Sequence, residues 1–350
     1  MVAGAQTGLR RAVTIKDVAA EAKVSRATAA RALNGYGYVG GAAAERVLEA
    51  AKRLGYRGNR VAQALRQGQM PIVGFVPGDI QNPFFARIAH DVDFELRRSG
   101  HNLLIAASEE DVTQERELID NLRALNVRGL IVAPASDRDN QHLVELVREG
   151  VPLVLVDREL PDVNCDSIMV DNEGGARAAV DYLIASGHRR IAVLHDDSRI
   201  VTTRERLAGY VQSLKSAGLP IEKRLMPVSR SIVEYAIDAT IRLFSQVDRP
   251  TALFTVDSLL TKGALLALRS MGLSIPHDVS LVGFDDFDLA TFTDPQITVV
   301  SQPVNQIGAL AVSMVLDRIG GNGEPWRHVR FPTRLIVRGS VSRPGAARGR

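Results

Sequence analysis

The sequence predicts an α/β protein in which a doubly wound parallel sheet follows a small all-α headpiece. Two short amphipathic helices come first, and from Pro71 onward apolar runs alternate with amphipathic helical stretches. The charge also changes near residue 70, because residues 1–70 hold twelve Lys/Arg against four Asp/Glu and the rest holds 31 against 36. The formal charge of +3 therefore combines a basic headpiece with an acidic body.

The composition is that of an ordinary globular chain. Its 350 residues are 45% hydrophobic and 24% charged, enough for a sizeable core in two or three domain units. The single cysteine, Cys165, excludes an intramolecular disulfide and a cysteine-cluster metal site, and we interpret it as an incidental thiol. No signal peptide opens the chain and no apolar run reaches about 18 residues, so we expect a cytoplasmic protein.

Residues 14–34 are predicted to form two helices joined by a tight turn near Lys23. Thr14 followed by Asp17 is a capping-box pattern, and Ser25 is placed to cap the second helix. The residues whose spacing can close a small core between the helices are Val18, Ala19, Ala22, Val24, Ala29, Ala32 and Leu33. A third helix is expected from Ala42 to Leu54, with one apolar face made of Val47, Leu48, Ala51 and Leu54.

A helix-turn-helix of this kind places its second helix in the DNA major groove. That helix presents Arg26, Ala27 and Arg31, and arginine can donate two hydrogen bonds to guanine. The alternative is an ordinary amphipathic helix pair with a solvated basic face. The net charge of +8 on residues 1–70 favours a surface that binds DNA.

The apolar runs of the body predict buried strands separated by helices. These runs are Ile72–Val76, Leu103–Ile105, Gly129–Val132, Val151–Val156, Ile191–Leu194, Ala252–Thr255 and Val279–Gly283. Polar or aromatic side chains follow several of them, at the strand ends where open α/β proteins bind ligands. These side chains suit a polyhydroxylated ligand and are Asp79, Asn82, Phe84, Phe85, Asp157, Arg158, Asp257, Asp285 and Asp286.

The chain resembles the LacI family of bacterial transcription regulators. The pattern Thr-Ile-x-Asp-Val-Ala-x-x-Ala-x-Val-Ser-x-x-Thr matches from Thr14 to Thr28, and Arg31 and Asn34 are also in place. Further matches follow in order at Arg46–Ala50, Leu54–Tyr56, Asn59–Leu65, Asn82–Phe85, Asp157–Arg158, Gly187–Ile191, Arg206–Tyr210 and Val282–Asp286. Several spaced matches in one order are more specific than a single motif.

The resemblance implies a body of two doubly wound parallel-sheet lobes, similar to periplasmic sugar-binding proteins. We place the crossings between the lobes near Val170, Pro303 and Pro332. The predicted organisation is a disordered N-terminus at 1–12, a helix-turn-helix headpiece at 13–57, a hinge helix at 58–69, a two-lobed effector-binding and dimerisation domain at 70–342 and a disordered tail at 343–350.

The resemblance also implies a homodimer on a pseudo-palindromic operator in double-stranded DNA. In the family, paired hinge helices enter the minor groove and a leucine wedges between base pairs; Leu65 matches that leucine, although core packing is its alternative role. Gly58 stands where proline often begins the hinge helix, and Lys23 stands where glycine is usual in the turn. The expected DNA contacts are Thr14, Ser25, Arg26, Ala27, Thr28, Arg31, Asn34, Asn59, Ala62 and Leu65.

For the cleft between the lobes, the resemblance implies a small sugar-like effector that controls operator binding. Val256 stands where many relatives have an effector-binding asparagine, which indicates an effector that lacks one hydroxyl or presents an apolar part there. The expected effector-binding residues are Asn82, Phe84, Phe85, Asp157, Arg158, Arg206, Val256, Asp285 and Gln302. Three alternatives stay open: the two phenylalanines serve the lobe core, Asp157 and Arg158 form a structural ion pair, and Arg206 is a solvated charge.

Other functions fit the sequence less well. A transporter's periplasmic sugar-binding protein predicts an export signal and no basic headpiece. An enzyme predicts a nucleophile, base and orienting group or paired metal ligands, and the seven histidines show no such spacing, so we expect no catalytic residue, metal or cofactor. An activator, or a global regulator modulated by a protein partner, would share the fold with a ligand-gated repressor.

Overall fold

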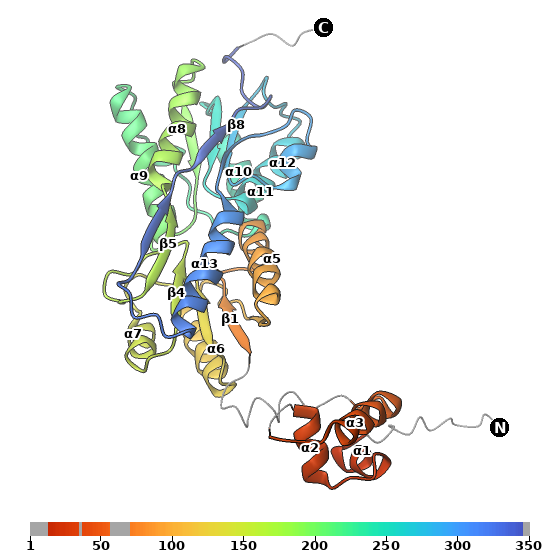
Figure 1. Cartoon of the computed structure of the whole chain (residues 1–350). Helices are drawn as coiled ribbons and strands as arrows, with labels where there is room; N and C mark the ends of the chain where they lie inside the picture. The colour runs from red at the N-terminus through yellow and green to blue at the C-terminus, as the bar shows by residue number, and fades with distance from the viewer. Residues whose placement is uncertain (1–12, 35–36, 57–70, 346–350) are drawn as a thin grey trace, which may run out of the picture. The chain divides into compact units, whose positions relative to one another are not determined.

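The structure, a computed structural model, describes most of the chain (Figure 1). The described ranges are 13–34, 37–56 and 71–345. The chain divides into two compact units, Met1–Met70 and Pro71–Arg350. Several predictions concern residues outside the described ranges: the N-terminal segment 1–12, the hinge helix 58–69 with Asn59, Ala62 and Leu65, and the last five residues of the tail.

The first unit consists of three short helices around a core of small apolar residues. The helices are α1 (Ile15–Glu21), α2 (Arg26–Asn34) and α3 (Gly41–Leu54). The core is made of Val18, Ala19, Ala22, Ala29, Val47, Ala50 and Ala51, and Val24, Ala32, Leu33 and Leu54 pack against it. The prediction for Leu48 is wrong: its side chain is 55% exposed, because one position along α3 turns it about 100° away from Val47.

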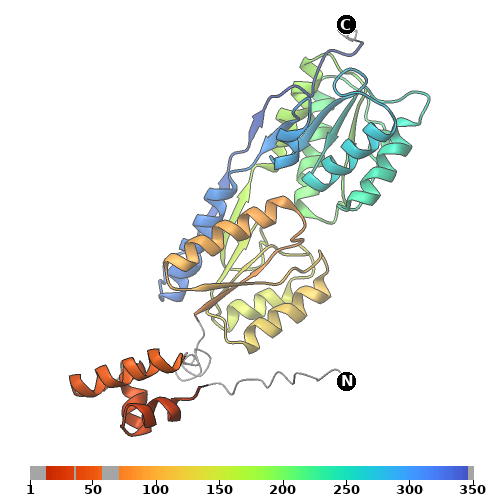
Figure 2. The ribbon, with the colours of Figure 1, turned by 90° about the vertical axis from the view of Figure 1, so that its right-hand side faces the viewer.

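The second unit contains two lobes, and lobe 1 holds a six-stranded parallel sheet in the order β10-β5-β4-β3-β1-β2. Its strands are β1 (Ile72–Val76), β2 (Asn102–Ile105), β3 (Gly129–Val132), β4 (Leu153–Val156), β5 (Asp166–Val170) and β10 (His328–Phe331). Its helices are α5 (Pro83–Arg98), α6 (Val112–Ala124), α7 (Gln141–Arg148) and α13 (Val304–Ile319). Because side chains alternate along a strand, Val73 and Phe75 pack with α5 and α13, and Val76 packs with α6 and α7. Figure 2 shows these two pairs of helices on opposite faces of the sheet.

Lobe 2 holds a five-stranded sheet in the order β11-β9-β8-β7-β6. Its strands are β6 (Ile191–Leu194), β7 (Ala252–Thr255), β8 (Ser280–Phe284), β9 (Thr298–Ser301) and β11 (Arg334–Ile336). Its helices are α8 (Asn172–Ala185), α9 (Val201–Ser216), α10 (Val233–Phe244), α11 (Ser258–Ser270) and α12 (Asp288–Phe292), with a 3-10 turn at Lys223–Leu225. The edge strand β11 runs antiparallel to β9, and the other neighbours are parallel.

The chain crosses between the lobes three times, at the predicted places. It passes from β5 to α8 after Val170, from β9 to α13 at Pro303, and from β10 to β11 through Pro332. The first and third crossings are hydrogen-bonded to each other, since Asp171 N donates to Phe331 O at 2.9 Å. All seven predicted strands are present, and the structure adds β5, β9, β10 and β11, which the apolar-run criterion did not select.

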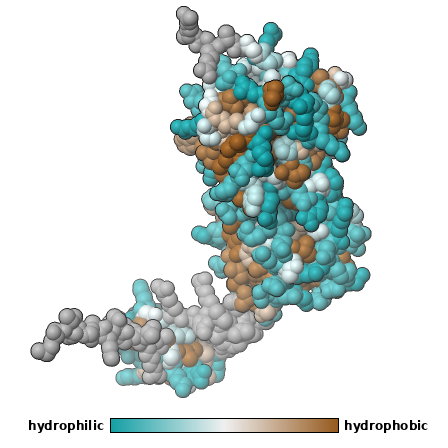
Figure 3. Space-filling view, turned by 180° about the vertical axis from the view of Figure 1, so that it is seen from behind, coloured by the Kyte–Doolittle hydropathy of each residue, from teal (hydrophilic) through white to brown (hydrophobic). Residues whose placement is uncertain are grey.

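The face of the molecule drawn in Figure 3 is largely hydrophilic, with apolar patches on both lobes. Among the helices in the described ranges, none combines the length and the apolar character needed to cross a membrane.

Candidate ligand cleft and nucleic-acid interface

The start of α2 is fixed by a side-chain cap. Thr28 N donates to Ser25 Oγ at 3.0 Å, and the two hydroxyl oxygens lie 2.9 Å apart. At α1, Asp17 Oδ2 accepts from both the backbone N and the Oγ of Thr14, each at 2.7 Å. The hydroxyls predicted to contact DNA therefore also define the helix ends, as expected from their cap positions.

The exposed face of α2 carries the predicted base-reading residues. Arg26, Ala27 and Arg31 are all exposed, whereas Ala29 is buried against α1 and α3. The side chain of Asn34 lies outside the described part of the chain. The turn before α2 holds Lys23 at φ +53°, in the left-handed region that favours glycine. Two arginines on one exposed, capped helix are suited to hydrogen bonding with guanine.

A cavity of about 780 Å³ lies between the lobes of the body. All nine predicted effector residues line it, together with Asp79 and Asp257. It also collects side chains that the sequence did not single out, from the loops after β2, β3 and β6, from the first turn of α9 and from the segment before α10. These include Glu109, Glu110, Asp111, Ser136, Asp137, Arg138, Asp196, Asp197, Arg199, Thr202, Thr203, Arg230 and Ser231.

Two strand-end aspartates face the cavity from opposite lobes. Asp157 follows β4 and Asp285 follows β8, with φ of +69° and +75°. Both are buried, and burial raises the pKa of Asp157 to about 6 although Arg158 and Arg206 oppose the shift. Burial likewise raises the pKa of Asp285, which accepts a hydrogen bond from Gln302 Nε2 at 2.5 Å. Such buried carboxylates gain from ligand groups that donate hydrogen bonds.

Arg158 is held by a carboxylate that the sequence did not indicate. Its Nη1 donates to Glu110 Oε2 at 2.6 Å and to Pro134 O at 2.5 Å, and its Nη2 donates to Glu110 Oε1 at 2.7 Å. Arg158 Nε lies 3.5 Å from Asp157 Oδ2. Arg158 therefore forms the structural ion pair with Asp157 that the sequence analysis considered, but its main ionic partner is Glu110.

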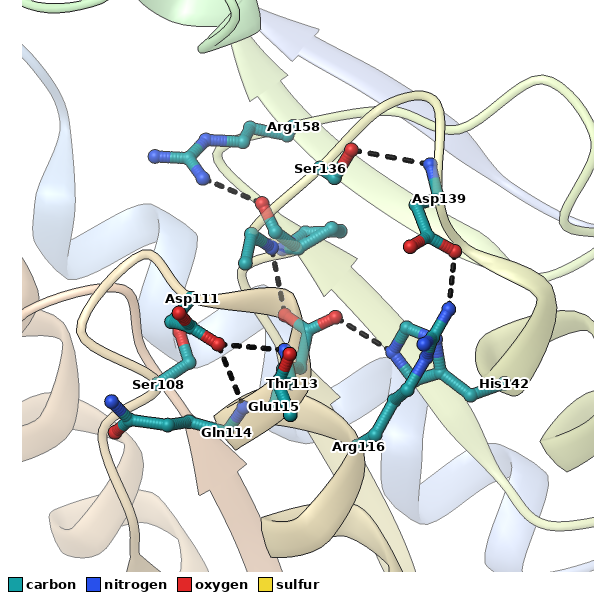
Figure 4. A network of polar contacts seen from close by, with 12 residues as sticks. Ser108, Asp111, Thr113, Gln114, Glu115, Arg116, Ser136, Asp139, His142 and Arg158 are labelled. Carbon is teal, nitrogen blue, oxygen red and sulfur yellow. Dashed lines mark hydrogen bonds and ion pairs between the residues drawn. The ribbon is translucent and has the colours of Figure 1, made fainter.

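A buried network supports the loop after β3 that meets Arg158 (Figure 4). Glu115, which is 1% exposed, accepts from Ala135 N at 2.7 Å, and its other oxygen lies 2.7 Å from His142 Nε2. Farther along this loop, Asp137 Oδ2 accepts from Arg204 Nη2 of lobe 2 at 2.5 Å. Because α6 binds the loop at Ala135 through Glu115 and at Asp139 through Arg116, the loop is held on both sides of Asp137.

Arg206 is buried rather than solvated, which resolves the alternative raised for it. Its Nε donates to Asn172 Oδ1 at 2.8 Å and its Nη1 donates to Val256 O at 2.6 Å. Its guanidinium lies over the ring of Phe284, 3.8 Å from the centroid. Val256 thus lines the cavity with an apolar side chain while its carbonyl positions Arg206.

Next to Val256, two carboxylates converge on one serine. Ser231 N donates to Asp196 Oδ2 at 2.9 Å, and Ser231 Oγ donates to Asp257 Oδ2 at 2.5 Å. Burial raises the pKa of Asp257 to about 6, and the charge of Asp196 adds to the effect. Asp257 also caps α11 by accepting from Leu260 N at 2.8 Å.

Asn82 and the two phenylalanines combine structural and lining roles. Asn82 Oδ1 caps α5 by accepting from Phe84 N and also accepts from Ser258 Oγ of lobe 2, both at 3.0 Å. Phe84 and Phe85 meet edge to face with centroids 5.1 Å apart, and both belong to the lobe 1 core. Both roles considered for these rings, core packing and contact with a ligand, are therefore compatible.

The cavity is acidic. Its lining includes ten Asp/Glu residues against five arginines, and none of the lining residues is lysine or histidine. Within the part of the chain that the structure describes, no group of three or more His, Cys, Asp or Glu side chains is arranged to hold a metal ion. The arrangement offers hydrogen-bond acceptors to a ligand rather than a positively charged pocket.

Comparisons with known proteins agree with this geometry. Residues 14–59 match the family model described as bacterial regulatory proteins, lacI family, and residues 180–341 match the periplasmic binding protein-like domain. The chain is 32% identical over 343 residues to the HTH-type transcriptional regulator PtxS of Pseudomonas putida, covering 95% of this chain and 97% of that protein.

Solved structures show the same architecture. A transcriptional regulator CelR–cellobiose complex is 30% identical with a TM-score of 0.70, covering 94% of this chain and 99% of that one. A Lac repressor dimer bound to operator and an anti-inducer is 26% identical with a TM-score of 0.81, covering 95% of this chain and 100% of that one. The two-lobed body with its helical headpiece is therefore a shared fold.

Proposed function

Because the chain belongs to the lacI family of bacterial regulatory proteins, we propose that it is a repressor whose binding to operator DNA is controlled by a sugar-like effector. The observation that carries the proposal is the capped helix α2, which holds Arg26 and Arg31 exposed on a helix-turn-helix unit. The acidic, two-lobed cleft supports the second half of the proposal, because it supplies a separate site for a small ligand.

On the DNA side, Arg26, Ala27 and Arg31 read base edges in the major groove of one half-site. The other proposed contacts are Thr14, Ser25, Thr28 and Asn34 in the headpiece and Asn59, Ala62 and Leu65 in the minor groove. The solved Lac repressor dimer on its operator supports a homodimer and a pseudo-palindromic site. A protein that binds operator DNA in a bacterium acts in the cytoplasm.

On the effector side, the nine predicted residues form a binding surface from both lobes. Asp157 and Asp285 accept hydrogen bonds from ligand hydroxyls, Arg206 donates from a fixed position, and the ring of Phe84 or Phe85 packs against an apolar face. The CelR–cellobiose complex, a relative with a bound sugar, supports a sugar for this chain as well. Effector binding changes the relation of the lobes and thereby the affinity for DNA.

The DNA half of the proposal is tested by selecting duplexes from a random pool with the full-length protein and titrating the selected operator at fixed salt. Arg31→Ala should weaken operator binding at least about tenfold, since a bidentate contact to guanine contributes about 1–3 kcal/mol of discrimination. Lys52→Ala, which removes the same charge from α3, should have a smaller effect. Unchanged affinity in Arg31→Ala would remove this residue from the base-reading set.

The effector half is tested by a thermal-shift screen of neutral mono- and disaccharides, followed by operator titration with each sugar that stabilises the protein. A sugar that raises the melting temperature and weakens operator binding supports the proposed repressor. A sugar that strengthens operator binding would make it a corepressor and reverse the direction of control.

A further inference from the structure

The two terminal nitrogens of Arg158 are already paired within the protein. Its Nη1 and Nη2 donate to the two oxygens of Glu110, and Nη1 also donates to Pro134 O. The side chain is 5% exposed, against 27% for Glu110. Although burial alone would lower the pKa of Arg158, the charge and hydrogen bonds of Glu110 raise it above its ordinary value. This bidentate pair is the strongest type of ionic contact that a guanidinium makes.

The loop after β2 is shaped to bring Glu110 to this position. Glu109 and Glu110 have φ of +52° and +57°, two consecutive left-handed residues that are not glycine. Such residues cost energy and persist where the surroundings demand them. Glu110 N donates to Gly78 O at 3.2 Å, and a Cβ on Gly78 would lie 2.1 Å from Glu110 Oε1, so only glycine leaves room for the carboxylate.

We propose that Glu110 determines the charge of the effector: by occupying Nη1 and Nη2 of Arg158 it makes the cleft reject anionic sugars and accept uncharged ones. The proposal rests on the effector role assigned above to the cleft. Arg158 is the residue next to Asp157 in the sequence, and its pairing with Glu110 reduces its capacity to bind a ligand. The carboxylates that line the cavity then face the ligand. A phosphate or carboxylate group beside Arg158 would meet their repulsion, while Nη1 and Nη2 of Arg158 are already paired with Glu110.

Glu109 provides a matched control for this role. It shares the left-handed backbone of Glu110 and lines the same cavity, and its side chain is exposed and makes no ion pair or hydrogen bond among those found in the described residues. Replacing either glutamate by glutamine removes one negative charge from the cleft. Only a change at Glu110 also weakens the pairing of Arg158, and Glu110→Ala removes that pairing altogether.

The test measures binding of inorganic phosphate to the full-length protein by calorimetry at constant ionic strength. The variants are Glu110→Ala, Glu110→Gln, Glu109→Gln and Glu110→Ala combined with Arg158→Met. Glu110→Ala should bind phosphate on the order of tenfold more tightly than wild type or Glu109→Gln, because the released guanidinium can bind an oxyanion at two points. The gain should disappear in the double variant, and Glu110→Gln should show a smaller gain.

Three results would overturn the proposal: wild type binds phosphate as tightly as Glu110→Ala, neither Glu110 variant gains affinity, or the gain survives the loss of Arg158. Far-ultraviolet circular dichroism establishes that each variant is folded, and Glu110→Gln, which keeps an acceptor for Arg158, replaces Glu110→Ala if the latter unfolds. Operator titration of the same proteins separates the two proposals. Intact operator binding without any phosphate gain contradicts the role of Glu110 alone.

Discussion

In each lobe, the third strand from the β10 or β11 edge of the sheet is followed by an aspartate in the same backbone conformation. Asp157 after β4 and Asp285 after β8 are both buried, both have a left-handed backbone and both line the cleft. A non-glycine residue held there costs about 1–3 kcal/mol, so each lobe stores strain where it lines the cavity. The lobes therefore present equivalent carboxylates from equivalent positions.

They differ in the residue that follows. In lobe 1, Arg158 turns into the cleft and binds Glu110. In lobe 2, Asp286 is not among the cavity-lining residues; it binds Arg338 Nη2 at 2.8 and 2.9 Å, and its carbonyl accepts from Arg87 of lobe 1. The end of β4 thus contributes to the cleft a guanidinium that Glu110 neutralises. At the end of β8, the charge of Asp286 instead pairs with Arg338, away from the cleft. The identity of the residue after the aspartate, rather than the backbone conformation, determines which charged group each strand end adds to the cleft.

The largest expected effect comes from breaking the two ion pairs in turn. Arg158→Ala should lower the free energy of unfolding by about 3 kcal/mol, because it leaves Glu110 and the carbonyl of Pro134 without their donor and the buried Asp157 without its adjacent positive charge. Arg338→Ala should cost about 1 kcal/mol, because it leaves only Asp286, which is 23% exposed, and the carbonyl of Ile297 without a donor, and no second buried carboxylate depends on Arg338. Urea unfolding at neutral pH measures both, and equal losses would contradict the distinction between the lobes.

A smaller effect is expected in the pH dependence of stability, to which both strand-end aspartates contribute. Burial raises the pKa of Asp157 to about 6, so between about pH 4 and 6 the folded state binds more protons than the unfolded state, and stability falls as pH rises. Asp157→Asn, which tolerates the left-handed backbone, should therefore exceed wild type by about 2 kcal/mol at pH 7.5 and match it near pH 4. Asp285→Asn should change stability in the same direction.

The control for this pH series is Asp238→Asn, at an exposed position on α10. Its stability curve should run parallel to that of wild type. The assignment to Asp157 fails if the Asp157→Asn curve keeps the same slope between pH 4 and 6 as wild type.

The smallest expected effect tests the contact between the lobes at Asn82. Asn82→Ala removes both the α5 cap and the bond from Ser258, and should cost about 1 kcal/mol. Ser258→Ala removes only the bond between lobes and should cost roughly half as much. Thermal unfolding compares the two variants, and an equal cost would mean that the cap contributes nothing.

Much of the fold was predictable because its strands are continuous apolar runs. β5 is not a continuous apolar run, because it begins with Asp166. This buried carboxylate is bound by Arg318 at 2.8 and 2.9 Å. β10 and β11 carry charged residues at exposed positions, and their pairing depends on the crossings rather than on local pattern. A buried charge is acceptable only where a distant partner neutralises it, and a local sequence pattern does not contain that partner.

The candidate site divides in the same way. Strand-end positions and the family resemblance selected nine residues that do line one cavity. Glu110 was missed because it lies 48 positions from Arg158, and its approach depends on two left-handed residues in a loop. The loops after β3 and β6 follow the same pattern, since Ser136, Asp137, Asp196 and Asp197 also come directly after predicted strands, so the sequence contains a signal for them.

The three crossings also limit how the lobes can move. Asp171 joins the first crossing to the third through Phe331, and Arg334 pairs with Ser301 beside the second, so the three connections form one hydrogen-bonded band. Three neighbouring connections allow the lobes to bend toward each other and oppose their twisting and separation. A ligand that contacts both lobes would therefore act mainly on the bend between them.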